Sequence, residues 1–137
     1  MTQTLISTAQ AQAIVAAGQA KAAEIGVPVN IAVLDAGAHL KAFARMDGAV
    51  LGSIDVSMGK ARTSVLFDIR SEAVWDYAKP GAPAPGLENT NGGLVPFGGG
   101  VPLKTVDGLT LGAVGVSGGA VAQDVAIAEA AAAALTA

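Results

Sequence analysis

Hydrophobic residues recur at helical spacing in four segments of this chain. A capping box, Ser7 with Gln10, opens the first segment, and Gly26 followed by Pro28 closes it. In the second segment, Ser53 can cap the helix. We expect the apolar stripe of this helix to be buried, and its residues are Ile54, Met58, Ala61 and Val65. The predicted helices are about Thr8 to Ile25, one from Ser53, a short one from Ser71, and one from about Ala120 to Leu135.

Five other segments have the composition or the alternation of strands: Val29 to Leu34, His39 to Met46, Leu94 to Phe97, Val101 to Val106 and Thr110 to Ser117. The first is apolar at nearly every position, as a central strand covered on both faces would be. In the second, His39, Lys41, Phe43 and Arg45 share one face. The element order αββααβββα, with mostly short connections, predicts an α+β fold with a five-stranded antiparallel sheet flanked by helices.

The chain is unusually apolar for a small domain. Of its 137 residues, 52% are hydrophobic and only 14% are charged, and its mean hydropathy is +0.53. One domain spanning residues 1–137 is expected at this length, yet such a composition leaves too little polar surface for a small monomer. We therefore expect a homo-oligomer larger than a dimer, with part of the apolar surplus buried between subunits.

Charge and residue usage exclude several classes of function. A net charge of −3, with only eight Lys and Arg in the whole chain, leaves no basic stripe for nucleic acid. No apolar run is long enough to span a membrane, and the first residues lack the pattern of a signal peptide, so we expect a cytoplasmic protein. Without cysteine and with one histidine, neither a zinc site nor a catalytic triad is expected.

Three motifs in order, AVLDAGAHLKAFARMDGAVLGSIDVSMGKARTS, NGGLVPFGGGVPL and GAVGVSGGAVAQDVAIAEA, resemble the GlcG/HbpS-like family, also called haem-degrading or DUF336. The resemblance covers almost the whole chain. It implies a profilin-like fold, with a five-stranded antiparallel sheet between helices, and homo-oligomers that include octamers. It also implies haem or a related tetrapyrrole as the leading ligand, although other relatives belong to glycolate utilisation or to a corrinoid adenosyltransferase.

The strand face that begins at His39 is the first candidate for a haem site. His39 is the chain's only histidine and a possible axial ligand, Phe43 could cover the ring, and Lys41 and Arg45 could pair with propionates. The alternative is that His39 closes a hairpin in contact with water. Met58 and Tyr77 are weaker candidates for the axial position. The resemblance implies a histidine on the first helix in some haem-binding relatives, and this chain has none there.

A second candidate is a polar stripe on the predicted second helix, made of Ser53, Ser57, Lys60 and Ser64. A lysine among hydroxyls would suit a small carboxylate or phosphate, and together with Arg62 it could act in catalysis if the protein is an enzyme. A solvated helix face is the competing interpretation.

Glycine-rich segments form the third candidate. Ser117, Gly118 and Gly119 end a strand and open a helix, where free backbone N–H groups could hold an anion, unless Gln123 or Asp124 caps them. Gly99 and Gly100 belong to a loop that is neither a phosphate loop nor a dinucleotide fingerprint, so no nucleotide is expected.

Taken together, these candidates predict a groove for a small ligand between the second helix, the glycine loop and the last helix. Three functions stay open. The first is a haem- or tetrapyrrole-binding protein, and the second is an enzyme acting on a small organic acid with Lys60, Arg62 and a backbone anion site. The third is a purely structural assembly.

Overall fold

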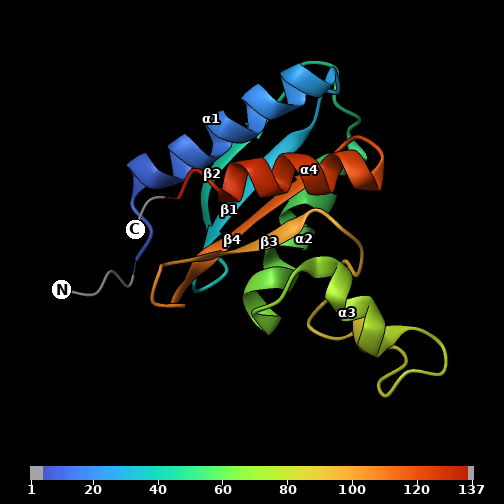
Figure 1. Cartoon of the computed structure of the whole chain (residues 1–137). Coiled ribbons are helices and arrows are strands. Elements are labelled where there is room, and N and C mark those ends of the chain that lie inside the picture. Colours follow the sequence, from blue (N-terminus) through green and yellow to red (C-terminus); the bar gives the residue numbers. More distant parts are fainter. Residues whose placement is uncertain (1–4, 136–137) are drawn as a thin grey trace.

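The computed structural model describes residues 5–135 (Figure 1). Its elements are α1 (Thr8–Ile25), β1 (Asn30–Asp35), β2 (Leu40–Arg45), α2 (Gly52–Phe67), α3 (Ser71–Ala78), the 3₁₀ helix η1 (Leu87–Asn89), β3 (Gly100–Lys104), β4 (Thr110–Ser117) and α4 (Val121–Ala132). The very start of the chain, where we expect no signal peptide, lies outside the described residues. Between residues 5 and 135, no helix combines the length and the apolar character needed to cross a membrane.

The described residues form an antiparallel sheet of four strands, in the order β2-β1-β4-β3. The α+β class is confirmed, but the prediction of five strands is wrong for this part of the chain, because residues 94–97 join no ladder. The N–H of Leu94 donates to Glu88 O and that of Val95 donates to Thr63 Oγ1, and Pro96 has no N–H to donate. The N–H groups of Leu94 and Val95 therefore bond to a 3₁₀ helix and to α2, and not to a neighbouring strand.

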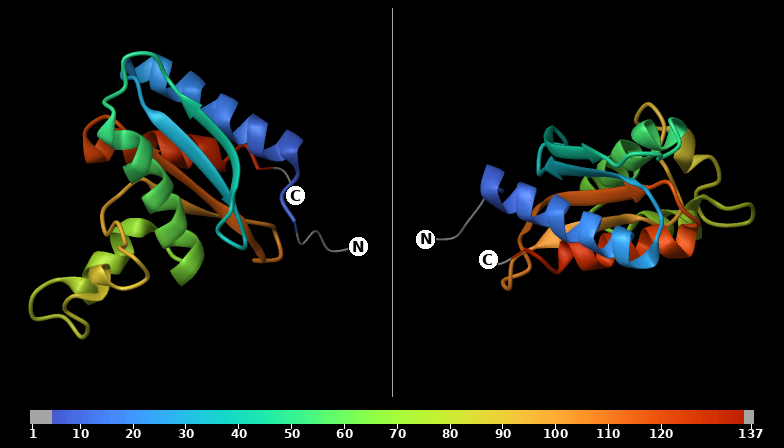
Figure 2. Two further views of the ribbon diagram at one scale, coloured as in Figure 1. Left: turned by 180° about the vertical axis from the view of Figure 1, so that it is seen from behind. Right: turned by 90° about the horizontal axis from the view of Figure 1, so that it is seen from above.

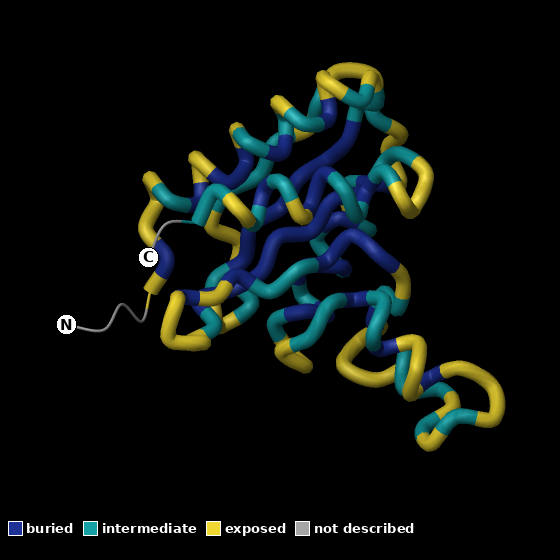
Figure 3. Tube along the Cα trace, in the orientation of Figure 1, coloured by how far each residue is buried: buried dark blue, intermediate teal, exposed yellow. Residues whose placement is uncertain are grey.

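Helices cover both faces of the sheet. Helices α1 and α4 lie side by side on one face, and α2 crosses the other, with α3 and the loop after it extending away (Figures 1 and 2). The larger core lies between the sheet and the α1–α4 pair, where Ile31, Val33, Val114 and Val116 are fully buried. As Figure 3 shows, burial is concentrated along the central strands. The prediction that the Val29–Leu34 segment is covered on both faces is thus confirmed.

Helix α2 turns an unexpected face to the sheet. Its buried residues are Ser53, Ser57, Lys60, Ala61, Thr63 and Ser64. Of the predicted apolar stripe, Ala61 is buried and Val65 is partly buried against the same small cluster, whereas the prediction is wrong for Ile54 and Met58. Ser53 is not the N-cap either, because the helix begins one residue earlier and the Ser53 hydroxyl donates to Val50 O.

Small residues on the sheet explain this close packing of α2. A Cβ placed on Gly115 of β4 would lie 2.0 Å from Ser57 O and 2.6 Å from Ala61 N. Glycine therefore lets the backbone of α2 approach the backbone of β4, which leaves no room for large apolar side chains between them. Short hydroxyl-bearing side chains fill the interface instead, and two of them bond to carbonyl oxygens of their own helix, Ser57 to Ile54 O and Thr63 to Gly59 O.

Candidate functional site

A buried ion pair lies where α2, β4 and α4 meet. Lys60 is fully buried, and its Nζ donates to Asp124 Oδ2 at 3.1 Å and to Val116 O at 2.8 Å. The same nitrogen lies 5.1 Å from the centroid of the Phe97 ring. Burial lowers the pKa of Lys60, while the charge of Asp124 and its hydrogen bond raise it. Lys60 thus has an acidic partner 64 residues away, and it lies on neither a solvated face nor an open pocket wall.

The glycine loop packs against this lysine. A Cβ on Gly99 would lie 2.5 Å from Val116 O and 2.8 Å from Lys60 Nζ, and one on Gly100 would lie 2.4 Å from Lys60 O. Both glycines are buried. Their absent side chains make room for Lys60 and the backbone of α2, so their observed role is close packing. Ser57 is also fully buried, with its hydroxyl bonded to Ile54 O.

The start of α4 is capped by its own side chains. The N–H of Gly119 donates to Asp124 Oδ1 at 2.9 Å, and that of Ala120 donates to Gln123 Oε1 at 2.9 Å. These are the capping residues that the sequence offers as the alternative to an anion site. The Gly119 amide is therefore engaged, and Asp124 holds both this amide and Lys60.

A groove of about 340 Å³ opens beside this network, between the start of α2 and the start of α4. We call it the Ser117 groove. Its lining residues are Val50, Gly52, Ser53, Val56, Phe97, Ser117, Gly118, Gly119, Val121 and Asp124. The structure thus brings Gly118 and Gly119 to the same groove as the second and last helices, whereas Lys60, Ser57, Gly99 and Gly100 are packed behind it.

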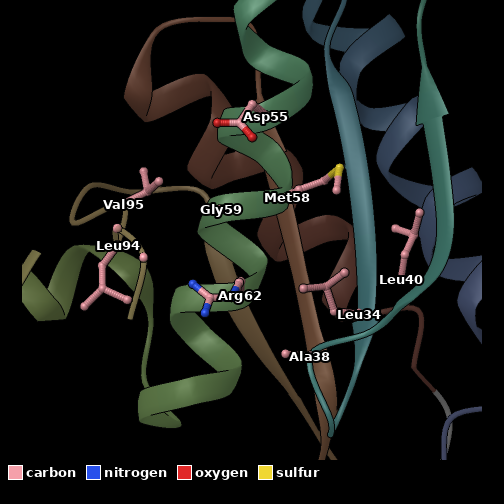
Figure 4. Close-up of a pocket in the computed structure, with 11 residues that line it drawn as sticks. Leu34, Ala38, Leu40, Asp55, Met58, Gly59, Arg62, Leu94 and Val95 are labelled. Atoms are coloured by element: carbon pink, nitrogen blue, oxygen red, sulfur yellow. The ribbon is translucent and has the colours of Figure 1, made fainter. Parts of the chain in front are cut away.

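A second cavity, of about 420 Å³, lies on the side of α2 that faces the β1–β2 turn (Figure 4). We call it the Met58 pocket. Its lining residues are Leu34, Ala38, Leu40, Asp55, Met58, Gly59, Arg62, Gly92, Gly93, Leu94 and Val95. Asp55, Met58 and Arg62 recur at helical spacing and present a carboxylate, a thioether and a guanidinium to one space.

Arg62 lies at one end of this pocket, where its Nη1 donates to Asn91 O at 2.6 Å. That bond ties α2 to the loop that carries Gly92 to Val95. Leucine side chains from β1, β2 and this loop line the space around Met58 (Figure 4). A volume in this range, with mostly apolar walls and a few polar groups, is typical of sites for small molecules and cofactors.

His39 and Phe43, two of the four residues predicted to share a strand face, line neither cavity. The side chain of His39 is 85% exposed, and its Nδ1 lies 3.8 Å from Asp35 Oδ1. Asp35 also accepts the N–H groups of Gly37 and His39, so it shapes the turn as an aspartate there is expected to do. Phe43 is half-buried opposite Ala32 in the sheet. His39 nevertheless directly follows Ala38, which lines the Met58 pocket.

Sequence reasoning missed two features of these sites. One is the partnership of Lys60 with Asp124, for which the sequence carries no signal. The other is the Met58 pocket, for which a signal exists: Asp55, Met58 and Arg62 share a helix face with Gly59, where a Cβ would lie 2.7 Å from the side chain of Val95. The glycine lets the loop approach α2 and close one wall of the pocket.

The fold and these two cavities, which are not the only ones among residues 5–135, define a small α+β protein with ligand-sized sites on both sides of one helix. The family model described as "Haem degrading protein HbpS-like" matches residues 6–133. The chain therefore belongs to the HbpS-like family, which confirms the resemblance seen in its motifs.

Several relatives extend over most of this chain. An uncharacterised 15.0 kDa protein from the dhaT-dhaS intergenic region of Citrobacter freundii is 42% identical over 125 residues, which are 90% of this chain and 87% of the relative. Protein GlcG of Escherichia coli K12 is 41% identical over 120 residues, which are 85% of this chain and 84% of GlcG. Corrinoid adenosyltransferase PduO of Citrobacter freundii is 40% identical over 116 residues, which cover 84% of this chain but only 34% of PduO.

Solved structures share the fold closely. Protein ORFY of Klebsiella pneumoniae, a DUF336 protein, superposes with a TM-score of 0.91 at 36% identity, covering 98% of this chain and 93% of ORFY. The PduOC:heme complex superposes with a TM-score of 0.89 at 34% identity, covering 96% of this chain and 95% of PduOC. One close structural neighbour has thus been solved with haem bound.

Proposed function

We propose that this protein binds haem or a related tetrapyrrole in the Met58 pocket and works as a homo-oligomer. The observation that carries the proposal is the combination in one pocket of apolar walls, the Met58 thioether and the Arg62 guanidinium. Haem needs an apolar slot, a partner for its propionates and an axial ligand, and these residues fit each need. The haem complex of the related PduOC domain supports the choice of ligand.

The residues of the Met58 pocket would contact different parts of the haem. Arg62 pairs with a propionate, because a guanidinium binds carboxylates through two parallel hydrogen bonds. Met58 or His39 would bind the iron: Met58 lines the pocket, whereas His39, whose imidazole is the stronger iron ligand, is exposed next to Ala38 on the pocket wall. Leu34, Leu40 and Leu94 contact the ring. The bound group would supply a redox-active iron.

We infer a homo-oligomer, with an octamer as the leading size, in the cytoplasm. Large apolar side chains that are at least 36% exposed and line neither cavity support assembly, among them Leu51, Leu66, Phe67 and Trp75. Such a concentration of exposed apolar side chains is typical of surfaces that become buried between subunits.

We place the enzyme hypothesis second. It needs Lys60, Arg62 and the Gly118–Gly119 amides to act on one small organic acid. In the structure Lys60 is bonded to Asp124 and Val116 O, the Gly119 amide is bonded to Asp124, and Arg62 lines the other cavity. These groups do not meet around a common space.

A haem titration tests the proposal. The purified protein is titrated with haemin, and the Soret band is followed to saturation. Arg62→Met is expected to weaken binding by about 5- to 30-fold, which is the loss of one charge-assisted contact of about 1 to 2 kcal/mol. Arg45→Met is the matched control, because Arg45 is an exposed arginine of β2 that lines neither cavity.

The axial ligand is tested in the same titration with Met58→Leu and His39→Ala. The variant that lacks the ligand is expected to change the position of the Soret band, whereas the other keeps the wild-type spectrum. Leucine conserves the volume of Met58, so lost packing does not explain a spectral change. No saturable Soret shift in the wild type, or equal affinities of Arg62→Met and Arg45→Met, would show that haem does not bind in this pocket.

A further inference from the structure

The Ser117 groove shares no lining residue with the Met58 pocket, and the proposed haem site makes no use of it. Its floor holds an unpartnered polar group. Ser117 lines the groove, is only 7% exposed, and its hydroxyl makes no hydrogen bond to any residue between 5 and 135. A hydroxyl that lines a groove and has no partner among these residues can bond to a molecule that enters the groove.

Asp124 provides a second polar group at the same floor. Its carboxylate accepts one bond from Lys60 and one from the Gly119 amide. A carboxylate offers about four acceptor positions, so two bonds leave room for a further donor. The groove thus presents an acceptor at Asp124 and a hydroxyl at Ser117, which can both donate and accept.

The charge around the groove selects a neutral ligand. No lysine or arginine lines it, and the Lys60 ammonium, which neutralises Asp124, is fully buried behind it. An anion would meet the Asp124 carboxylate without a free cation to offset it, and a cation would compete with Lys60 for the same carboxylate. The Ser53 hydroxyl also lines the groove but is bonded to Asn30 Nδ2 and Val50 O. Apart from glycines, the remaining walls are the apolar side chains of Val50, Val56, Phe97 and Val121, which suit C–H groups.

We propose that the Ser117 groove binds a small uncharged polyol. One ligand hydroxyl donates to Asp124, a second accepts the hydrogen bond of the Ser117 hydroxyl, and the carbon chain packs against Phe97 and the valines. The site is independent of the proposed haem site, so one can be occupied or lost without the other.

Ligand-observed NMR titration of the full chain, purified without glycerol, tests this proposal. Glycerol is expected to give a saturable signal with a dissociation constant in the millimolar range, while glycerate, its carboxylate counterpart, binds at least about tenfold more weakly because of Asp124. Ser117→Ala is expected to weaken glycerol binding by about 3- to 10-fold, since one hydrogen bond between neutral groups is lost. Ser57→Ala is the matched control, because Ser57 is buried on α2 outside the groove.

Val121→Trp keeps the test decisive if Ser117→Ala does not fold. Val121 is 48% exposed at the rim, so a larger side chain there can fill the groove without entering the core. We expect it to abolish glycerol binding and to leave the haemin titration unchanged. The proposal is overturned by the absence of a saturable glycerol signal, by glycerate binding as tightly as glycerol, or by wild-type glycerol affinity in either groove variant. None of these results bears on the Met58 pocket.

Discussion

Replacing Lys60 by methionine is expected to destabilise the fold strongly. The substitution keeps the apolar stem of the side chain but removes the cation from a pair whose side chains are 0% and 3% exposed. Asp124 would then keep only the Gly119 amide as a partner, at 2.9 Å. Breaking a buried ion pair by removing one partner costs about 3 to 5 kcal/mol, because the other charge is left without compensation. For a domain of this size, that loss corresponds to a fall in Tm of about 10 to 25 °C.

Urea unfolding followed by circular dichroism, at fixed protein concentration, measures this loss. The double variant Lys60→Met/Asp124→Leu is expected to recover a large part of it, because no uncompensated charge remains, although the Gly119 amide loses its acceptor. Arg62→Met is the control on the same helix. Among residues 5–135 its one hydrogen bond is from Nη1 to Asn91 O, so a loss below about 1 kcal/mol is expected. Equal losses for Lys60→Met and Arg62→Met, or a double variant no more stable than Lys60→Met, would refute the assigned role of the pair.

Three further predictions concern the same structure. Because burial lowers the pKa of Lys60, the folded state binds fewer protons than the unfolded state between that lowered pKa and 10.5. Stability contributed by Lys60 therefore rises with pH in this window, and the difference in urea midpoint between wild type and Lys60→Met should widen toward pH 10.5, not narrow. Gly115→Ala should cost about 1 to 3 kcal/mol in urea unfolding, because its Cβ would lie 2.0 Å from Ser57 O, whereas Gly52→Ala, which meets no atom within 4 Å, should not destabilise the fold. Light scattering should give a multiple of 13.4 kDa larger than a dimer, and a monomer would contradict the assembly.

Elements that rest on local signals could be predicted closely from the sequence. Helix α1 has the predicted bounds, Thr8 to Ile25, because a capping box and a glycine C-cap fix its two ends. Strand β4 also has its predicted bounds, Thr110 to Ser117. The turn at Asp107 and Gly108 sets its start, and the glycines that follow Ser117 set its end. In both cases the residues that decide the boundary lie within a few positions of it.

Features that depend on distant partners could not be predicted in the same way. Residues 94–97 have the composition of a strand, but the acceptors of their N–H groups, Thr63 Oγ1 and Glu88 O, lie in α2 and in a 3₁₀ helix. The pairing of Lys60 with Asp124 joins two helices that are 64 positions apart. Nothing near either residue distinguishes this lysine from one on a solvated helix face.

The orientation of α2 links the buried pair to both candidate sites. Hydrophobic periodicity predicts that the apolar stripe of a helix faces the core, but here Gly115 lets the backbones approach so closely that hydroxyls and Lys60 fill the contact. Lys60 then requires a buried acid, and Asp124, which meets this need, also forms part of the floor of the Ser117 groove. The displaced apolar stripe places Met58 on the opposite side, in the wall of the other cavity. One close approach of two backbones therefore puts a polar floor on one side of α2 and an apolar pocket on the other.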